Sequence, residues 1–249
     1  MPVRPITAVA LLLGLLIVPL VWTAGVVYAS QFQHWSEARW DSAGLAPDPA
    51  TTPEAVVQVY AARTWGWKGV FAVHSWLVMK RAGADAYERY EVVGWGVRHG
   101  RPALRRDMRE VDGYWAGNRP TVLVDHRGPQ AEALIEQIEV AIEAYPYPDQ
   151  YRTWPGPNSN TFIAYIGRSV PALGLELPPT AVGKDYLSNG NLFAPTPSGT
   201  GYQMSLLGLL GLSVGRDEGL ELNLLGLVLG IDPLDVAIKL PGVGKLGLF

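Results

Sequence analysis

The chain has 249 residues, of which 48% are apolar and 17% are charged, and its formal net charge is −3. A chain of this length can bury one sizeable core, and without a basic excess it is not expected to bind a nucleic-acid backbone. Cysteine is absent, which excludes disulfides, thiolate catalysis, cysteine-ligated zinc and a lipoprotein anchor.

An uncharged N-terminal stretch, residues 6–29, is the strongest local signal. A helix needs about 20 apolar residues to cross a bilayer core, and this stretch supplies them. Arg4 precedes it, and Trp22 lies toward its far end, where aromatic rings favour the membrane interface. We therefore expect residues 1–29 to be a single-pass anchor in membrane lipid. The domain is then on the periplasmic or extracellular side of the cytoplasmic (inner) membrane. A signal peptide cleaved after Ala29 is the alternative.

A linker is predicted at residues 30–53, which contain three prolines and show no hydrophobic period. An α+β domain is expected to follow at residues 54–201. Runs rich in β-branched and aromatic residues predict four strands in it. These strands are expected at residues 55–62, 70–79, 87–95 and 121–125.

Two helices are predicted in the second half of this domain. Between residues 130 and 145, apolar residues recur at helical spacing, and the prolines that follow end the helix. The second helix is expected to begin near Asn158 and to stop at Pro171. Its start is indicated by three consecutive residues of types that cap helices, Asn158, Ser159 and Asn160.

The C-terminal segment, residues 202–249, is rich in leucine and glycine and contains two similar stretches, 205–215 and 223–233. Each is roughly half the length that a spanning helix needs. The alternation of polar and apolar residues around Glu221 favours strands. One interpretation is a buried hairpin packed on the domain. The other is an apolar surface that rests on the membrane near the anchor.

A candidate site begins in residues 154–162, where a Pro/Gly-rich turn leads into the second predicted helix. Backbone N–H groups at a helix start are unpaired and stabilise negative charge. Ser159 carries the hydroxyl in the triplet 158–160 and is the candidate nucleophile. Asn158, Asn160 and Trp154 are expected to hold an oxyanion or substrate beside it. The alternative is plain helix capping.

His74 and Glu91 lie on neighbouring predicted strands. A serine nucleophile needs a base, usually histidine, and a carboxylate can orient the imidazole. We expect His74 to be that base and Glu91 its orienting group. The alternatives are a packed core histidine and a solvated glutamate. The histidines are scattered and no metal-binding or nucleotide-binding motif occurs, so neither a metal nor a cofactor is expected.

Several segments resemble an uncharacterised bacterial family, catalogued as domain of unknown function 3750. The segments are ARTWGWKGVFAVHSWLVMK, YEVVGW, WPGPNSNTF, PPTAVGKDY and LLGLxLGIDP, within residues 36–248. The family has no assigned function, so this resemblance implies none.

The chain also resembles circularly permuted papain-like hydrolases, in which a histidine strand precedes a helix that opens with Asn-Cys-Asn. His74, the strand at 87–95 and Asn158-Ser159-Asn160 have this order, with serine in place of cysteine. The resemblance implies a permuted papain-like antiparallel sheet with packed helices, followed here by the Leu/Gly-rich hairpin. It also implies an amide or ester hydrolase. The expected location beside the membrane, and not the resemblance, makes an envelope peptide or lipid the expected substrate. Histidine deprotonates a serine hydroxyl less readily than a thiol. A non-catalytic domain that binds a partner protein or lipid is therefore the alternative.

Overall fold

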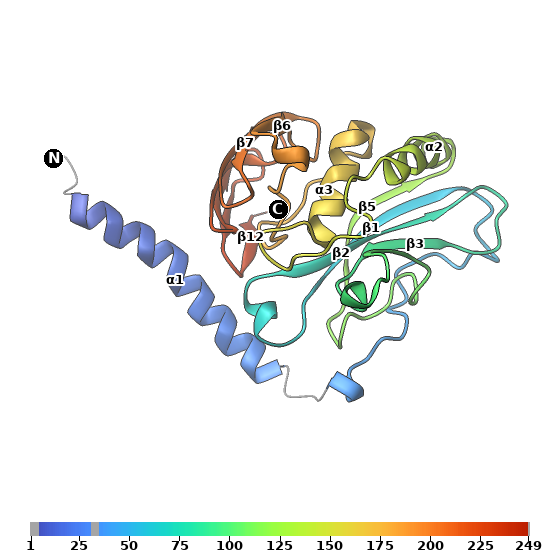
Figure 1. The fold of residues 1–249 in the computed structure, drawn as a ribbon, viewed down its shortest axis with the longest axis horizontal. Helices are drawn as coiled ribbons and strands as arrows, with labels where there is room; N and C mark the ends of the chain where they lie inside the picture. The colour runs from blue at the N-terminus through green and yellow to red at the C-terminus, as the bar shows by residue number, and fades with distance from the viewer. Residues whose placement is uncertain (1–4, 31–34, 249) are drawn as a thin grey trace.

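The computed structural model describes residues 5–30 and 35–248. A long helix, α1 (Pro5–Ser30), precedes an α+β unit that contains two antiparallel sheets. Figure 1 shows α1 as an arm that extends away from this unit, with the C-terminal sheet on the side toward the helix. The predicted α+β class is confirmed.

The first sheet has five antiparallel strands in the order β4-β3-β2-β1-β5. They are β1 (Val56–Arg63), β2 (Val73–Lys80), β3 (Glu88–Val92), β4 (Leu104–Arg106) and β5 (Thr121–Arg127). Four of them overlap the predicted strands. β4 escapes sequence prediction because three residues are too few to show a period. β1 and β2 lie centrally and are almost entirely buried, so their sequences are continuous rather than alternating apolar runs.

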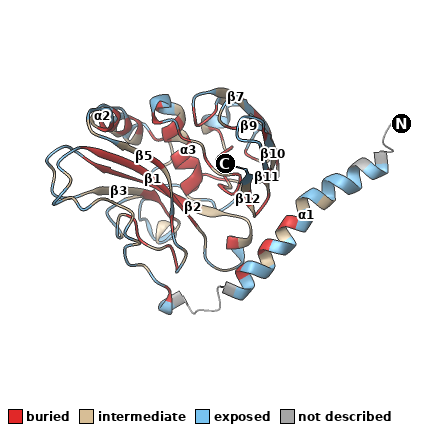
Figure 2. Cartoon of the chain, turned by 180° about the vertical axis from the view of Figure 1, so that it is seen from behind, coloured by how far each residue is buried: buried red, intermediate tan, exposed pale blue. Residues whose placement is uncertain are grey.

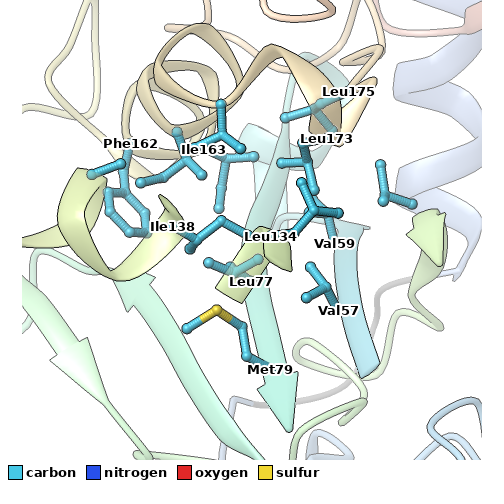
Figure 3. Packing of buried hydrophobic residues seen from close by; sticks show 14 of the residues in the cluster. Val57, Val59, Leu77, Met79, Leu134, Ile138, Phe162, Ile163, Leu173 and Leu175 are labelled. Atoms are coloured by element: carbon cyan, nitrogen blue, oxygen red, sulfur yellow. The ribbon is translucent and has the colours of Figure 1, made fainter. Parts of the chain in front are cut away.

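Two helices cover one face of this sheet, at the predicted places. They are α2 (Pro129–Glu143) and α3 (Ser159–Ser169). Their apolar side chains pack against those of the sheet and form the main core, shown in Figure 3. Leu77, Ile138 and Phe162 are each fully buried there, and burial of one such side chain stabilises the fold by about 1.5–3 kcal/mol. This packing fixes α3, and with it the position of Ser159.

Irregular chain covers the opposite face of the first sheet. Trp40 packs edge-on against Trp115, with ring centroids 5.6 Å apart. The Asp112 carboxylate accepts a hydrogen bond from the backbone N–H of Ala46 at 3.1 Å. Part of the segment expected to be a linker, 30–53, therefore packs against the domain.

The second sheet is an antiparallel meander of seven strands. They are β6 (Phe193–Pro195), β7 (Gly201–Leu206), β8 (Leu210–Gly215), β9 (Gly219–Leu224), β10 (Leu227–Asp232), β11 (Ala237–Leu240) and β12 (Gly244–Gly247). The strands expected around Glu221 are present, but the single hairpin is wrong. One turn that extends the meander is Leu225-Gly226, with φ of 57° and 87°. Such a turn favours Asn or Asp as its first residue, and leucine is unusual there. The residue types therefore do not predict this turn.

One stripe of α1 contacts the rest of the molecule. Pro19, Thr23 and Val27 are buried, whereas most other described side chains of α1 are exposed, as Figure 2 shows. The spacing of four residues puts these three on one face of the helix. A Cβ at Gly242 would lie 3.0 Å from Leu20 and 3.1 Å from Thr23, so glycine permits this close approach.

The segment Val9–Ala29 of α1 is long enough and apolar enough to cross a membrane, by length and composition. The same helix packs against the short 3-10 helix η2 (Gly66–Val70) and against β10 and β11. The arm is therefore attached to the side of the molecule that carries the second sheet.

Candidate functional site

A cavity of about 760 Å³ lies between the first sheet and the start of α3. Four of the predicted site residues line it, namely His74, Asn158, Ser159 and Asn160. β2 runs beneath α3, where Ser75 Oγ donates a hydrogen bond to Asn160 Oδ1 at 2.8 Å. His74, the preceding residue, points to the opposite face of the sheet, where its ring stacks on Trp115. The cavity thus extends from the start of α3 to the His74 side of the sheet.

The His74 imidazole is held by a buried carboxylate. Its Nε2 lies 2.8 Å from Glu91 Oε2, and Arg89 Nη2 donates to the same oxygen at 3.0 Å. The Glu91 and Arg89 side chains are each only 1% exposed. The indole of Trp115 stacks on the imidazole, with ring centroids 3.6 Å apart. The ring plane and one nitrogen are thereby fixed, and Nδ1 makes no hydrogen bond to any described residue.

The charges of this pair follow from its surroundings. Burial alone would raise the pKa of Glu91, but the hydrogen bond from His74 and the charge of Arg89 outweigh it and lower the pKa to about 2. Burial lowers the pKa of His74 more than Glu91 raises it. At neutral pH the carboxylate is therefore ionised and the imidazole neutral. Nε2 keeps its proton and donates a hydrogen bond to Glu91. Nδ1 therefore carries the lone pair that a general base needs.

The start of α3 is a complete capping box. Asn158 Oδ1 accepts hydrogen bonds from the backbone N–H groups of Asn160 at 3.0 Å and Thr161 at 3.1 Å. In return, Thr161 Oγ1 accepts one from the Asn158 backbone N–H at 3.2 Å. The backbone N–H groups of Asn158 and Asn160, which were expected to help hold an oxyanion, are therefore already hydrogen-bonded. The Ser159 N–H and Oγ make no hydrogen bond within the described ranges and are the groups left for a ligand.

The two asparagine side chains hold the site together. Asn160 Nδ2 donates to the carbonyls of Val73 at 3.0 Å and Val182 at 2.9 Å. Asn158 Nδ2 donates to the carbonyls of Thr153 and Val182, each at 3.1 Å. Both amides link α3 to neighbouring segments, so their geometry is structural.

Comparison with known proteins assigns the chain to a family. The model described as Protein of unknown function (DUF3750) matches residues 54–186, more than half of the chain. The chain belongs to this family. No curated protein and no solved structure matches it. The DUF3750 range contains the first sheet, both of its helices and every candidate site residue, and it ends before β6.

One predicted residue of this DUF3750 chain lies apart from the others. The Trp154 indole Nε1 donates to the Leu225 carbonyl at 2.9 Å, in the turn between β9 and β10. Trp154 is absent from the described residues that line the cavity. In the segment that leads into α3, Trp154 thus contacts the second sheet, whereas Asn158 and Asn160 line the cavity.

Several residues around the cavity of this DUF3750 member were not predicted from the sequence. Arg89 had a usable signal, because residues two apart on a strand share a face and Arg89 lies two before Glu91. Trp115 lies outside any described helix or strand, where no periodicity reports its direction. Lys68, Arg98 and Arg152 also line the cavity, whereas no described acidic side chain does. The cavity is therefore suited to a ligand that carries negative charge.

A cluster of carboxylates lies elsewhere, at the edge of the second sheet. Glu176, Asp232 and Asp235 bring carboxylate oxygens within 4.8 Å of one another. Lys245 Nζ forms ion pairs with all three. The lysine ammonium thus already occupies the position that a cation would take.

Replacing Asn158 with alanine is expected to destabilise the protein by about 0.5–2 kcal/mol, the usual range for loss of a cap. The change removes the acceptor for two buried N–H groups, and with it both links to Thr153 and Val182. Asn158→Asp keeps the acceptor and is expected to lose less. Thermal unfolding of the two variants checks this. An unchanged midpoint for Asn158→Ala would contradict the structural role.

Proposed function

We propose that this protein is a membrane-anchored hydrolase of amides or esters, with α1 as a single-pass anchor and the domain on the periplasmic or extracellular side of the cytoplasmic membrane. Ser159 is the nucleophile, His74 the general base and Glu91 the group that orients it. One observation carries the proposal. His74, whose Nε2 is bonded to Glu91, and Ser159 line the same cavity.

The reaction follows from these groups. Ser159 Oγ bonds to the substrate carbonyl carbon while its proton passes to His74 Nδ1, and the carbonyl oxygen becomes an oxyanion beside the Ser159 N–H. Collapse of this intermediate breaks the bond to the leaving group, which takes the proton from Nδ1. Water, deprotonated by the same nitrogen, then releases the acyl group and restores the serine. Glu91 stays ionised and stabilises the imidazolium that forms at each step.

The substrate proposed is an envelope peptide or lipid that carries an acidic group. The basic side chains of Lys68, Arg98 and Arg152 support this, since each lines the cavity. Attachment through α1 would bring the cavity close to such molecules. The order of the histidine strand, the glutamate strand and the Asn-Ser-Asn helix supports a relation to permuted papain-like hydrolases.

Labelling by a fluorophosphonate probe tests the nucleophile. We expect wild-type protein to be labelled, Ser159→Ala not to be labelled, and Ser188→Ala, which changes a serine outside the cavity lining, to react like the wild type. Because burial lowers the pKa of His74 below its ordinary value near 6.5, labelling should persist in mildly acidic buffer and decline only at lower pH. Labelling that survives in Ser159→Ala would assign the reactive serine elsewhere.

The second candidate function is a non-catalytic domain that binds a partner protein or lipid. It is favoured by one observation, that no hydrogen bond joins Ser159 Oγ to His74 among the described residues. In unliganded enzymes such bonds are often long and tighten with substrate, so we place the hydrolase first. No probe labelling, together with no turnover across ester and amide libraries, would leave the binding function.

A further inference from the structure

The second sheet has its apolar side chains outside and its polar side chains inside. On β7, Gln203 and Ser205 are buried, whereas Tyr202, Met204 and Leu206 are exposed. An antiparallel sheet with one face in water normally shows the reverse alternation. An apolar exterior with a polar interior is the arrangement of strands that face lipid.

The strand register gathers these outward side chains into rows across the sheet. One row crosses six strands and consists of Tyr202, Val214, Leu220, Ile231, Ile238 and Leu246. A parallel row pairs Met204 with Leu212, Leu212 with Leu222 and Leu222 with Leu229. No charged residue interrupts either row. We call this surface the outer face of the second sheet.

The opposite, inner face is held against the domain by buried charges. Glu221 on β9 forms ion pairs with Lys184 and with Lys239, and all three side chains are no more than 3% exposed. A register slip of one residue would expose these charges and bury the leucines. Since the ion pairs define which face is inside, the apolar outer face is a fixed property of the fold.

The outer face lies beside α1. The helix packs against β10 and β11, and Figures 1 and 2 both show the second sheet on the side of the molecule toward the arm. Leu20 of α1 lies close to Gly242, between β11 and β12. The apolar helix and the apolar sheet face therefore adjoin, and a bilayer around the helix reaches the sheet.

We propose that the outer face of the second sheet is immersed in the bilayer that α1 spans, with its leucine rows in contact with acyl chains. The inference rests on the anchor part of the proposed function and is independent of the hydrolase chemistry. The aqueous alternative leaves two adjoining rows of large apolar side chains in water. Contiguous apolar surface of this kind marks a contact with membrane or protein, and its continuity with α1 selects the membrane.

Site-directed spin labelling of the full chain tests the inference, because the sequence has no cysteine to interfere. Single cysteines are placed at Leu212 on the outer face, at Leu13 in α1 and at Val140 on α2. Val140 is the matched control, an exposed aliphatic residue that is 67% accessible and outside the second sheet. Each protein is reconstituted into phosphatidylethanolamine–phosphatidylglycerol vesicles, and nitroxide collisions with oxygen and with a water-soluble nickel chelate are measured.

We expect the labels at Leu212 and Leu13 to collide readily with oxygen, which dissolves in lipid, and to show a severalfold loss of nickel access relative to Val140. Nickel access at Leu212 with protection at Leu13 would overturn the inference and leave the anchor in place. Nickel access at both positions would overturn the anchor as well. Exclusion of both reagents at Leu212 would show protein covering the face, such as a second copy of the chain, and would also overturn it.

Discussion

Replacement of Glu91 by alanine is expected to destabilise the protein by about 3–5 kcal/mol, because it leaves a buried charge without its partner. Arg89, 1% exposed, bonds to the same carboxylate oxygen as His74. Without Glu91, water must reach the Arg89 guanidinium, and this disrupts the packing of the surrounding core. Chemical denaturation in a constant detergent measures the loss, and Glu91→Gln separates the charge from the size of the side chain.

The matched control for this variant lies on the same strand. Glu88 pairs with Arg106, and both side chains are well exposed, so Glu88→Ala is expected to cost about 1 kcal/mol or less. Equal losses for Glu91→Ala and Glu88→Ala would show that the buried pair is not what holds β3 in place.

The stability that Glu91 contributes has a defined pH dependence. Its folded pKa, about 2, lies below the unfolded value, near 4.3 for a free glutamate. The folded state therefore binds this proton less readily than the unfolded state. The contribution is fully present above the unfolded pKa and is lost as the pH falls toward 2. Glu91→Gln should lose this part of the acid sensitivity.

Replacement of Glu221 by alanine is the second large effect, again about 3–5 kcal/mol. Glu221 accepts from Lys184 Nζ and, at 2.8 Å, from Lys239 Nζ. The charges of these lysines outweigh burial and hold the pKa of Glu221 below its usual range. Its loss leaves two buried ammonium groups, with Lys184 near Asp185 and Lys239 bound to Glu176 as the remaining pairs.

Thermal unfolding followed by near-ultraviolet circular dichroism measures this loss. The control is Glu132→Ala on α2, where the ion pair with Arg81 is exposed on both sides and a change of at most about 1 kcal/mol is expected. A midpoint for Glu221→Ala as high as that of Glu132→Ala would mean that the inner face of the second sheet tolerates unpaired lysines.

The regular parts of the fold are predictable from the residues. The helical spacing of Leu134, Ile135 and Ile138 predicts α2, and the same side chains are buried against the first sheet. The Asn158 cap predicts the start of α3 to within one residue. In both cases the deciding interactions are local, so a short segment of sequence contains them.

The second sheet could not be predicted in the same way. The alternation around Glu221 indicates a strand, but local sequence does not say which face is inside. That choice depends on Lys184, which lies 37 residues away from Glu221. The usual rule buries leucines, and it led to the interpretation of a buried hairpin, which the exposure of Leu212 and Leu220 contradicts.

The site was predictable in composition but not in geometry. Sequence order suggests that His74 and Glu91 lie on adjacent strands, and the pairing of β2 with β3 makes their bond possible. Neither the stacking of Trp115 on the imidazole nor the separate position of Trp154 has a local signal, because both depend on loops from distant parts of the chain.

The bonding of the Asn158-Ser159-Asn160 triplet has a consequence for evolution. The outer two residues carry the hydrogen bonds that join α3 to its neighbours, while the hydroxyl of the middle residue bonds to no described residue. Folding therefore constrains positions 158 and 160 far more tightly than position 159. A lineage can exchange a hydroxyl for a thiol there, or discard both, and keep the same scaffold. Reactivity at this position is inherited separately from shape.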